Sequence, residues 1–352
     1  MKIKFPLVWV WASLLLTSNY IQAQNIPVVK LPRASQRAIV GQTIGITDIT
    51  IKYHRPSIRG RKIHQQNIAP LGRVWRAGAN ENTVIEFTHP VQIEGKALAA
   101  GKYGLHMIPG KEKWVVIFSK NYRSWGSYYY KKEEDALRIE VKPSQVNSQE
   151  WLTYEFTDIT KNTALVSMKW ATTKIDFKVT VDVHKIVVGN LREEMRDLSG
   201  YYWQASFLAA RYCYYNNYNL KEALQWINRS IGIDKNFQNL LVKSQLLSKQ
   251  NKKAEGQKLK KQAYDMANEN QLIQYGYNMG PEIPKAEIMA HFAYIIKRFK
   301  TWTAYQAQGV MSRYLGDKNI AIKSFEKALK LAPKKQQARL ENAVKSLKKN
   351  NK

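Results

Sequence analysis

The sequence has little sulfur and little acid. Its 352 residues include one cysteine, Cys213, so no disulfide can form within the chain. Asp and Glu number 27 against 56 Lys and Arg, which leaves a formal net charge of +29. This charge favours anionic partners, although the excess lysines could equally be solvated helix faces that keep the protein soluble. No apolar run reaches the ~20 residues of a spanning helix, so the chain is not predicted to cross a membrane.

Motifs that would indicate a reaction are also missing. Without HExxH or His-x-His spacing, we expect no metal site from His54, His64, His89 and His106. Without GxSxG, we do not expect Ser119, Ser124 or Ser127 to form a catalytic triad with His106 and Asp135. No motif supports a catalytic carboxylate pair among Glu81, Glu86, Glu94, Glu133, Glu134 and Asp135. The sequence therefore favours a protein without catalysis, metal or cofactor.

Residues 1–23 have the composition of a secretory signal peptide. A basic start, Met1-Lys-Ile-Lys, precedes an apolar run from Phe5 to Leu16 and a small-residue exit that ends at Ala23. We expect cleavage near Ala23 and export to the periplasm or the exterior. An uncleaved anchor is the alternative, but the apolar run is too short for one.

Residues 24–184 are predicted to form a β domain. From about Ile44 to Val183 apolar and polar residues alternate with a period of two, as in half-buried strands. Between Lys174 and Val183 the apolar positions are Ile175, Phe177, Val179, Val181 and Val183. The run from Trp114 to Phe118 is instead apolar throughout, which is typical of a strand covered on both faces. We expect an antiparallel sandwich or a partly closed barrel.

After a junction at residues 185–200, residues 201–352 have the pattern of amphipathic helices. Alanines recur in the second helix of successive predicted pairs, spaced by 31, 32 and 35 residues, at Ala223, Ala254, Ala286 and Ala321. This spacing is close to the tetratricopeptide period of about 34 residues. In the last unit, Gly309 and Ala321 would let two helices approach while Phe325 fills the seam. We predict an all-α tetratricopeptide-like helical repeat domain that docks a protein partner, with a generic helical bundle as the alternative.

The β half also carries a set of motifs in a fixed order. They are Tyr53-His-Arg-Pro56, Gly60-Arg61, Val74-Trp-Arg-Ala-Gly-Ala-Asn80 with Thr83, Ala100-Gly-Lys-Tyr103, Ile108-Pro109, Trp114, Trp125-Gly126 and Leu137-Arg138. Over residues 34–182 the chain thereby resembles the bacterial family catalogued as domain of unknown function 2911. The resemblance implies an exported β domain, followed in some members by helical repeats, and it implies no activity. The chain departs from the family pattern at His54 and His64.

The densest arginine cluster lies between Tyr53 and Asn80. Planar guanidinium groups bind carboxylates and phosphates through two hydrogen bonds, and they stack on aromatic rings. We take six residues as candidate ligand-binding residues around one concavity for an anion or a sugar: Tyr53, Arg55, Arg61, Trp75, Arg76 and Asn80. The alternative is structural: the arginines would be struts on backbone carbonyls, and the aromatic residues would belong to the core.

A second aromatic group resembles a sugar-stacking platform and comprises Trp114, Trp125, Tyr128, Tyr129 and Tyr130. Three successive tyrosines must point to both sides of an extended chain, so we favour core packing and loop anchoring. The function that the sequence favours is an exported binding protein for an acidic glycan, a lipid headgroup or an anionic protein, without nucleic acid as a partner. An envelope hydrolase that acts through the arginine-rich region is the alternative.

Overall fold

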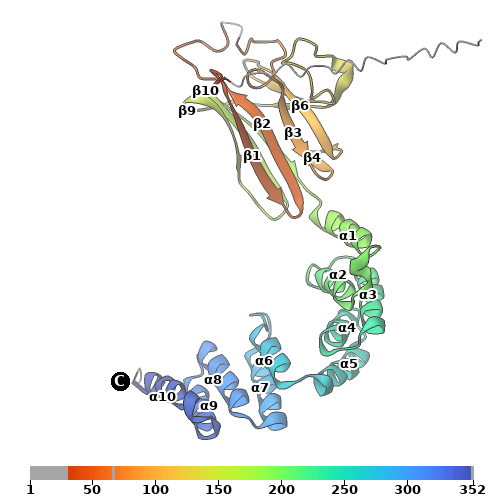
Figure 1. Cartoon of the computed structure of the whole chain (residues 1–352), viewed down its shortest axis with the longest axis vertical. Coiled ribbons are helices and arrows are strands. Elements are labelled where there is room, and N and C mark those ends of the chain that lie inside the picture. The colour runs from red at the N-terminus through yellow and green to blue at the C-terminus, as the bar shows by residue number, and fades with distance from the viewer. Residues whose placement is uncertain (1–30, 66–67, 350–352) are drawn as a thin grey trace, which may run out of the picture. The chain divides into compact units, whose positions relative to one another are not determined.

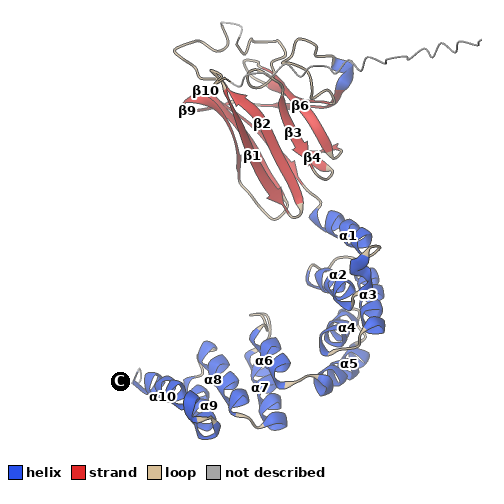
Figure 2. Ribbon diagram, viewed as in Figure 1, coloured by secondary structure: helices blue, strands red, loops and turns tan. Residues whose placement is uncertain are grey.

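The computed structural model describes residues 31–65 and 68–349, and it divides into two compact units (Figure 1). The described residues of the unit Met1–Val181 form strands, and those of the unit Asp182–Lys352 form helices (Figure 2). The predicted signal peptide, residues 1–23, lies outside the described residues. Among the described residues, no helix has the length and apolar character needed to cross a membrane.

The first sheet of the β unit has six antiparallel strands in the order β1-β2-β3-β6-β7-β8. Their bounds are β1 (Gln36–Ile44), β2 (Thr47–Arg55), β3 (Thr83–Phe87), β6 (Gly101–Ile108), β7 (Trp114–Ser119) and β8 (Asp135–Val141). Strands β1 and β2 form a hairpin with a two-residue turn that begins at Gly45. Its φ of 62° suits glycine at the first turn position, where other residues would be strained.

The second sheet has four antiparallel strands in the order β5-β4-β10-β9. Their bounds are β4 (Val91–Ile93), β5 (Lys96–Leu98), β9 (Ser144–Thr157) and β10 (Thr163–Thr180). The two sheets face each other through aromatic contacts. Phe118 meets Phe177 edge to face with ring centroids 5.6 Å apart, and Tyr53 meets Tyr154 at 4.8 Å. The β unit is therefore an antiparallel sandwich, the first of the two predicted forms.

The alternation predicted for β10 is confirmed along the strand but wrong at its end. Ile175, Phe177 and Val179 are fully buried against the first sheet. The strand stops at Thr180, however, and Val183 begins helix α1. The reason is local, because the Asp182 side chain accepts a hydrogen bond from the Lys185 backbone nitrogen and so caps the helix.

The second unit contains ten α-helices among its described residues. They are α1 (Val183–Glu194), α2 (Trp203–Tyr215), α3 (Leu220–Ile233), α4 (Phe237–Lys249), α5 (Lys253–Met266), α6 (Glu269–Tyr277), α7 (Lys285–Phe299), α8 (Trp302–Tyr314), α9 (Lys318–Leu331) and α10 (Lys334–Lys349). Neighbouring helices share buried apolar clusters, and one such cluster draws on α4 through α8. Cys213 is fully buried in another cluster, and burial raises the pKa of its thiol to about 11.

The small residues expected at helix contacts are partly confirmed. Ala223 and Ala321 are fully buried, and a Cβ at Gly309 would lie 3.0 Å from the Phe325 ring. Ala254 and Ala286 are exposed, so the alanine spacing did not mark the contact positions of α5 and α7. In α5 the close approach occurs two residues later at Gly256, where a Cβ would lie 2.7 Å from the Ser244 carbonyl oxygen of α4.

We expect Phe177→Ala to destabilise the β unit by about 3–5 kcal/mol, because it removes a buried ring from between the two sheets. Denaturant unfolding followed by tryptophan fluorescence measures this loss. Ile159→Ala, which trims a half-exposed side chain in the β9–β10 connection, is the control and should change stability by less than about 0.5 kcal/mol. Equal effects of the two substitutions would contradict the sandwich core described above.

Candidate functional site

The outer face of the six-stranded sheet carries a row of polar side chains. Residues opposite each other in paired strands point to the same face. The register pairs Arg37 of β1 with His54 of β2 near one edge of the sheet. Toward the other edge, on the same face, it pairs His106 of β6 with Ile117 of β7, and Ile117 with Arg138 of β8. Alternation places Tyr53 on the opposite, inner face, where it is buried. One face of this sheet therefore packs in the core and the other presents polar groups.

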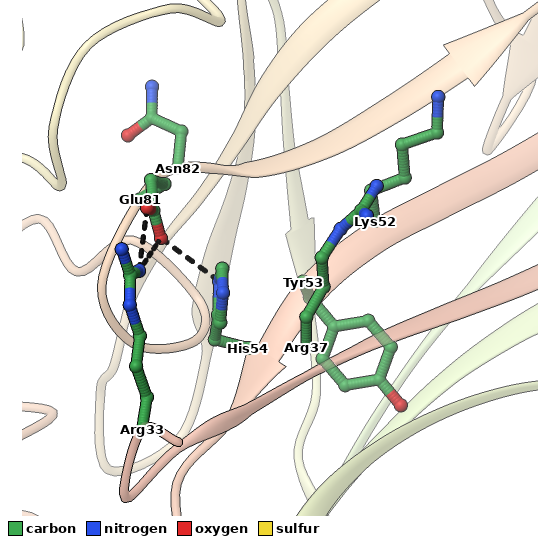
Figure 3. A pocket seen from close by; sticks show the side chains of 7 residues that line it. All are labelled: Arg33, Arg37, Lys52, Tyr53, His54, Glu81 and Asn82. Carbon is green, nitrogen blue, oxygen red and sulfur yellow. Dashed lines mark hydrogen bonds and ion pairs between the residues drawn. The ribbon is translucent and has the colours of Figure 1, made fainter. Parts of the chain in front are cut away.

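At one end of this row a cleft opens, with a volume of about 430 Å³ (Figure 3). Its lining is rich in cationic groups and comprises Arg33, Arg37, Lys52, Tyr53, His54, Glu81 and Asn82. The residues come from three places that are far apart in the sequence: the segment before β1, the β1–β2 hairpin, and the turn that leads into β3. The cleft is thus a product of strand pairing.

Among the described residues that line the cleft, Glu81 is the single acid, and it binds two of the other lining groups. Arg33 Nη1 donates to both carboxylate oxygens, at 2.6 and 2.8 Å, and His54 Nδ1 lies 3.3 Å from Oε2 (Figure 3). Burial raises the pKa of Glu81, but the hydrogen bond from Arg33, together with the backbone and nearby charges, outweighs it and leaves this pKa below its ordinary value. Burial lowers the pKa of His54, Glu81 raises it, and Arg33 and Arg37 lower it, with a net decrease.

The other two cations of the cleft are weakly engaged. Arg37 is exposed, and within the described ranges it makes no hydrogen bond or ion pair. Lys52 lies 3.7 Å from Glu86, which also lies 3.6 Å from Lys102. Such partly exposed pairs at long distance contribute little to stability. The cleft therefore presents positive charge at Arg37, beside Lys52, whose one ion pair with a described residue is the contact with Glu86 at 3.7 Å.

The structure does not bring the six predicted residues together around one concavity. Tyr53 and Trp75 lie in the core, where Trp75 stacks on Trp170 with ring centroids 5.7 Å apart. Tyr53 also lines the cleft, and its hydroxyl oxygen accepts a hydrogen bond from the Tyr154 backbone nitrogen at 3.1 Å. The aromatic pair thus lies in the sandwich interior, as in the structural alternative.

All three predicted arginines, Arg55, Arg61 and Arg76, donate to backbone carbonyls. Arg55 donates to the Leu152 carbonyl (2.9 Å) and the Thr153 hydroxyl (2.6 Å). Arg61 donates to the carbonyls of Ser57 and Ile58 at 2.7 and 3.0 Å.

The predicted residues Arg76 and Asn80 lie beside the cleft. Arg76 Nη1 donates to the Asn80 carbonyl, and the Asn80 amide donates to the Ser35 carbonyl at 3.0 Å. Asn80 directly precedes Glu81 in the chain and has a left-handed φ of 58°. This geometry fits Arg76 and Asn80 as residues that hold the cleft's rim.

Buried polar groups hold the loop at residues 120–130 against the sheet. The Asn82 amide, oriented with its nitrogen toward acceptors, donates to the carbonyls of Ser124 (3.2 Å) and Gly126 (2.5 Å). His106 Nδ1 and Ser127 Oγ are joined by a hydrogen bond of 2.9 Å. Nothing in the sequence indicated this contact between Ser127 and His106, because local periodicity does not encode a loop that closes over β6.

This Ser–His pair is enclosed. His106 is 2 % exposed, and burial, with a further contribution from the Arg76 charge, lowers its pKa to about 4. The hollow beside it, lined by residues that include Ser119 and Tyr130, has no room for a water-sized sphere. Asp135 accepts from the Tyr130 hydroxyl at 2.6 Å and pairs with Arg138 at 2.7 Å. The pair thus satisfies a buried imidazole, and the nearby acid is engaged elsewhere.

In the described ranges, no group of three or more His, Cys, Asp or Glu side chains is placed to hold a metal ion. Sequence reasoning missed the cleft cations Arg33, Arg37 and Lys52. Because no short motif contains them, the one available signal was the strand alternation that places Lys52 and His54 on a single face.

The family motifs fall at positions that shape this site: Tyr53-His-Arg-Pro56 ends β2, Asn80 shapes the rim, and Gly126 lies in the loop over the sheet. Residues 35–179 match the family model described as "Protein of unknown function (DUF2911)". The resemblance found from the motifs is confirmed over this range, which lies within the β unit. No curated protein matches the chain.

The pKa of His106 predicts a pH effect on stability. The unfolded imidazole titrates near 6.5 and the folded one near 4, so between these values the unfolded chain binds more protons and stability falls as the pH is lowered. We expect this group to contribute a loss of about 3 kcal/mol from pH 6.5 to 4, and His106→Asn to remove that part of the pH dependence. Unfolding by denaturant at several pH values measures it. An unchanged pH dependence in the variant would rule out His106 as the source.

Proposed function

We propose that this is an exported, non-catalytic binding protein whose DUF2911 segment holds an anionic ligand in the cleft and whose helical unit docks a protein partner. The observation that carries the first part is Arg37, which has no hydrogen bond or ion pair with any residue that the structure describes and lies in a cleft lined by further cations. The composition of residues 1–23 supports export.

In this proposal a carboxylate, sulfate or phosphate group binds between Arg37 and Lys52. Hydrogen bonds to charged groups are the stronger ones, and a planar guanidinium can offer two at once. Glu81 acts as an internal competitor, because its carboxylate already occupies Arg33 and faces His54. The resting charge of the cleft is therefore positive but limited, which favours small anionic groups over bare polyanions.

Replacing Arg37 and Glu81 should change anion affinity in opposite directions. We expect Arg37→Ala to weaken binding of galacturonate or sulfate about tenfold, because a charge-assisted hydrogen bond is lost. Glu81→Gln should strengthen binding about threefold, because it removes a negative charge that repels the anion and keeps a hydrogen-bond acceptor for Arg33. Isothermal titration calorimetry on the full chain measures both changes.

The matched control for Arg37→Ala is Arg339→Ala, which removes an exposed arginine from helix α10. It should leave affinity unchanged, whereas a general effect of net charge would make the two arginine variants alike. Binding that is insensitive to Arg37 would refute the cleft as the anion site.

For the helical unit we propose tetratricopeptide-like pairing of α2 with α3, α4 with α5, and α8 with α9. The close contacts at Gly256 and Gly309 support such pairing, because each lets two helices approach. An apolar surface supports docking. Leu198, Tyr201, Tyr202 and Leu208 are all at least 48 % exposed, and Tyr202 and Leu208 line a cavity of about 420 Å³ together with Met195. Exposed groups of this kind often mark protein contacts.

Placing a charge in this cavity should disrupt docking. We expect Leu208→Arg to abolish capture of a specific protein from envelope extracts by the full chain, because a guanidinium in an apolar contact loses its hydration. Mass spectrometry of the captured proteins identifies what is lost. Leu331→Arg, which alters another exposed leucine at the end of α9, is the control and should leave capture intact. If both variants capture the same proteins as the unaltered chain, the cavity is not the docking surface.

The alternative is an envelope hydrolase. The observation in its favour is Ser127 Oγ at 2.9 Å from His106 Nδ1, near Arg76. A nucleophile needs access to substrate and a base held by an orienting acid. The enclosure of His106 and the engagement of Asp135 with Tyr130 and Arg138 lead us to favour binding.

A further inference from the structure

The loop at residues 120–130 exposes large aromatic rings. Trp125 is 50 % exposed, Tyr128 is 76 % exposed and Tyr129 is 72 % exposed, whereas Trp114, of the same predicted aromatic group, is buried in the core. Single exposed apolar residues need no explanation, but two rings held in place beside a charged cleft do. The two rings are those of Trp125 and Tyr128, because each contacts an arginine at the cleft or its rim.

Arg33 joins Trp125 to the cleft. Its guanidinium carbon lies 5.8 Å from the centroid of the Trp125 ring, while its Nη1 atom binds Glu81 at 2.6 Å. Arg76 joins Tyr128 in the same way. Its guanidinium carbon lies 5.4 Å from the Tyr128 ring centroid, while its Nη1 atom binds the carbonyl of Asn80, the residue before Glu81. Trp125 is thus one side chain away from the cleft, and Tyr128 is one side chain away from its rim.

The loop backbone is fixed by groups that contribute little to the apolar core. Asn82 is 5 % exposed and, in the orientation given above, binds two loop carbonyls, and His106 binds Ser127. At Gly126, where φ is 64°, a Cβ would lie 2.5 Å from the Arg76 guanidinium carbon. Glycine at this position therefore lets Arg76 pass under the loop. The rings are held before any ligand arrives, which reduces the entropy cost of binding.

The cleft and the rings of Trp125 and Tyr128 together suit a ligand that carries both negative charge and sugar rings. Arg37 and Lys52 suit an acidic group, Glu81 can accept hydrogen bonds from hydroxyl groups, and the aromatic faces suit the C–H face of a sugar ring. A nucleic-acid strand would also stack on the rings, but its closely spaced phosphates would meet the Glu81 carboxylate. Glu81 therefore favours a ligand in which acidic groups alternate with neutral hydroxyls.

We propose that the cleft and the rings of Trp125 and Tyr128 form one extended site for an acidic oligosaccharide. The acidic group of one sugar binds Arg37 and Lys52, and a neighbouring sugar ring stacks on Trp125. This assignment rests on the proposed anion-binding function and adds to it the class of ligand. Carboxylated and sulfated sugars share this chemistry, and the test separates them.

Calorimetric titration of the full chain tests the assignment. The probes are galacturonate, trigalacturonate, a hyaluronan hexasaccharide, a chondroitin sulfate hexasaccharide, maltotriose as the neutral sugar, and a thymidylate oligonucleotide. We expect at least one acidic oligosaccharide to bind more tightly than galacturonate, and more tightly than maltotriose or the oligonucleotide. The carboxylated and sulfated members of the set show which acid is preferred.

The double variant Trp125→Ala with Tyr128→Ala should weaken oligosaccharide binding about tenfold and leave galacturonate binding unchanged. Tyr129→Ala removes an equally exposed neighbouring ring and should change neither affinity. The extended site would be overturned, and the anion site would stand, if galacturonate binding depends on Arg37 but the double variant binds oligosaccharides as tightly as the unaltered chain. Failure of all three acidic oligosaccharides, or tighter binding of the oligonucleotide, would also overturn it. Absence of any Arg37-dependent anion binding would instead remove the underlying function.

Discussion

The need to satisfy buried polar groups on the outer face of the six-stranded sheet shapes the rest of the β unit. The His106 imidazole and the Asn82 amide lie at positions where the sheet would otherwise face solvent, and both are almost fully buried. Such groups must find partners or they destabilise the fold. The loop between β7 and β8 supplies those partners from its backbone and from Ser127. Its path over the sheet follows from this requirement.

The same loop connects the interior of the sandwich to the charged cleft. On the inner face, Phe118 and Phe177 hold the two sheets together, and Trp75 stacks on Trp170. Arg76 follows Trp75 in the chain and reaches the outer side, where it meets the loop and the rim of the cleft. Anchoring Trp75 in the core therefore also positions Arg76. In the arginine-rich segment that the sequence marked as a candidate binding site, the guanidinium groups of Arg55, Arg61 and Arg76 donate to backbone carbonyls.

Features of the fold that depend on local periodicity could be predicted from the sequence. Alternation identified the buried side of β10, because a half-buried strand repeats every two residues, but it did not reveal that Asp182 would cap a helix and end the pattern. Alanine spacing located helical pairs without identifying the contact in α5, where Gly256 and not Ala254 lies against α4. The cleft was missed because Arg37 meets His54 through strand register, and Arg33 meets Glu81 across 48 positions of the chain. The match over residues 35–179 is to a family of unknown function, so it indicated no chemistry.

The burial of Cys213 has a practical consequence. This thiol has no exposed surface, and its high pKa keeps it protonated at neutral pH, so it reacts poorly with alkylating or maleimide reagents. Because the chain has no other cysteine, a new one placed on any exposed loop becomes a selective attachment point for a fluorophore or spin label. Pairs of such labels, one in each unit, would report the distance between the strands and the helices in solution without removal of the native thiol.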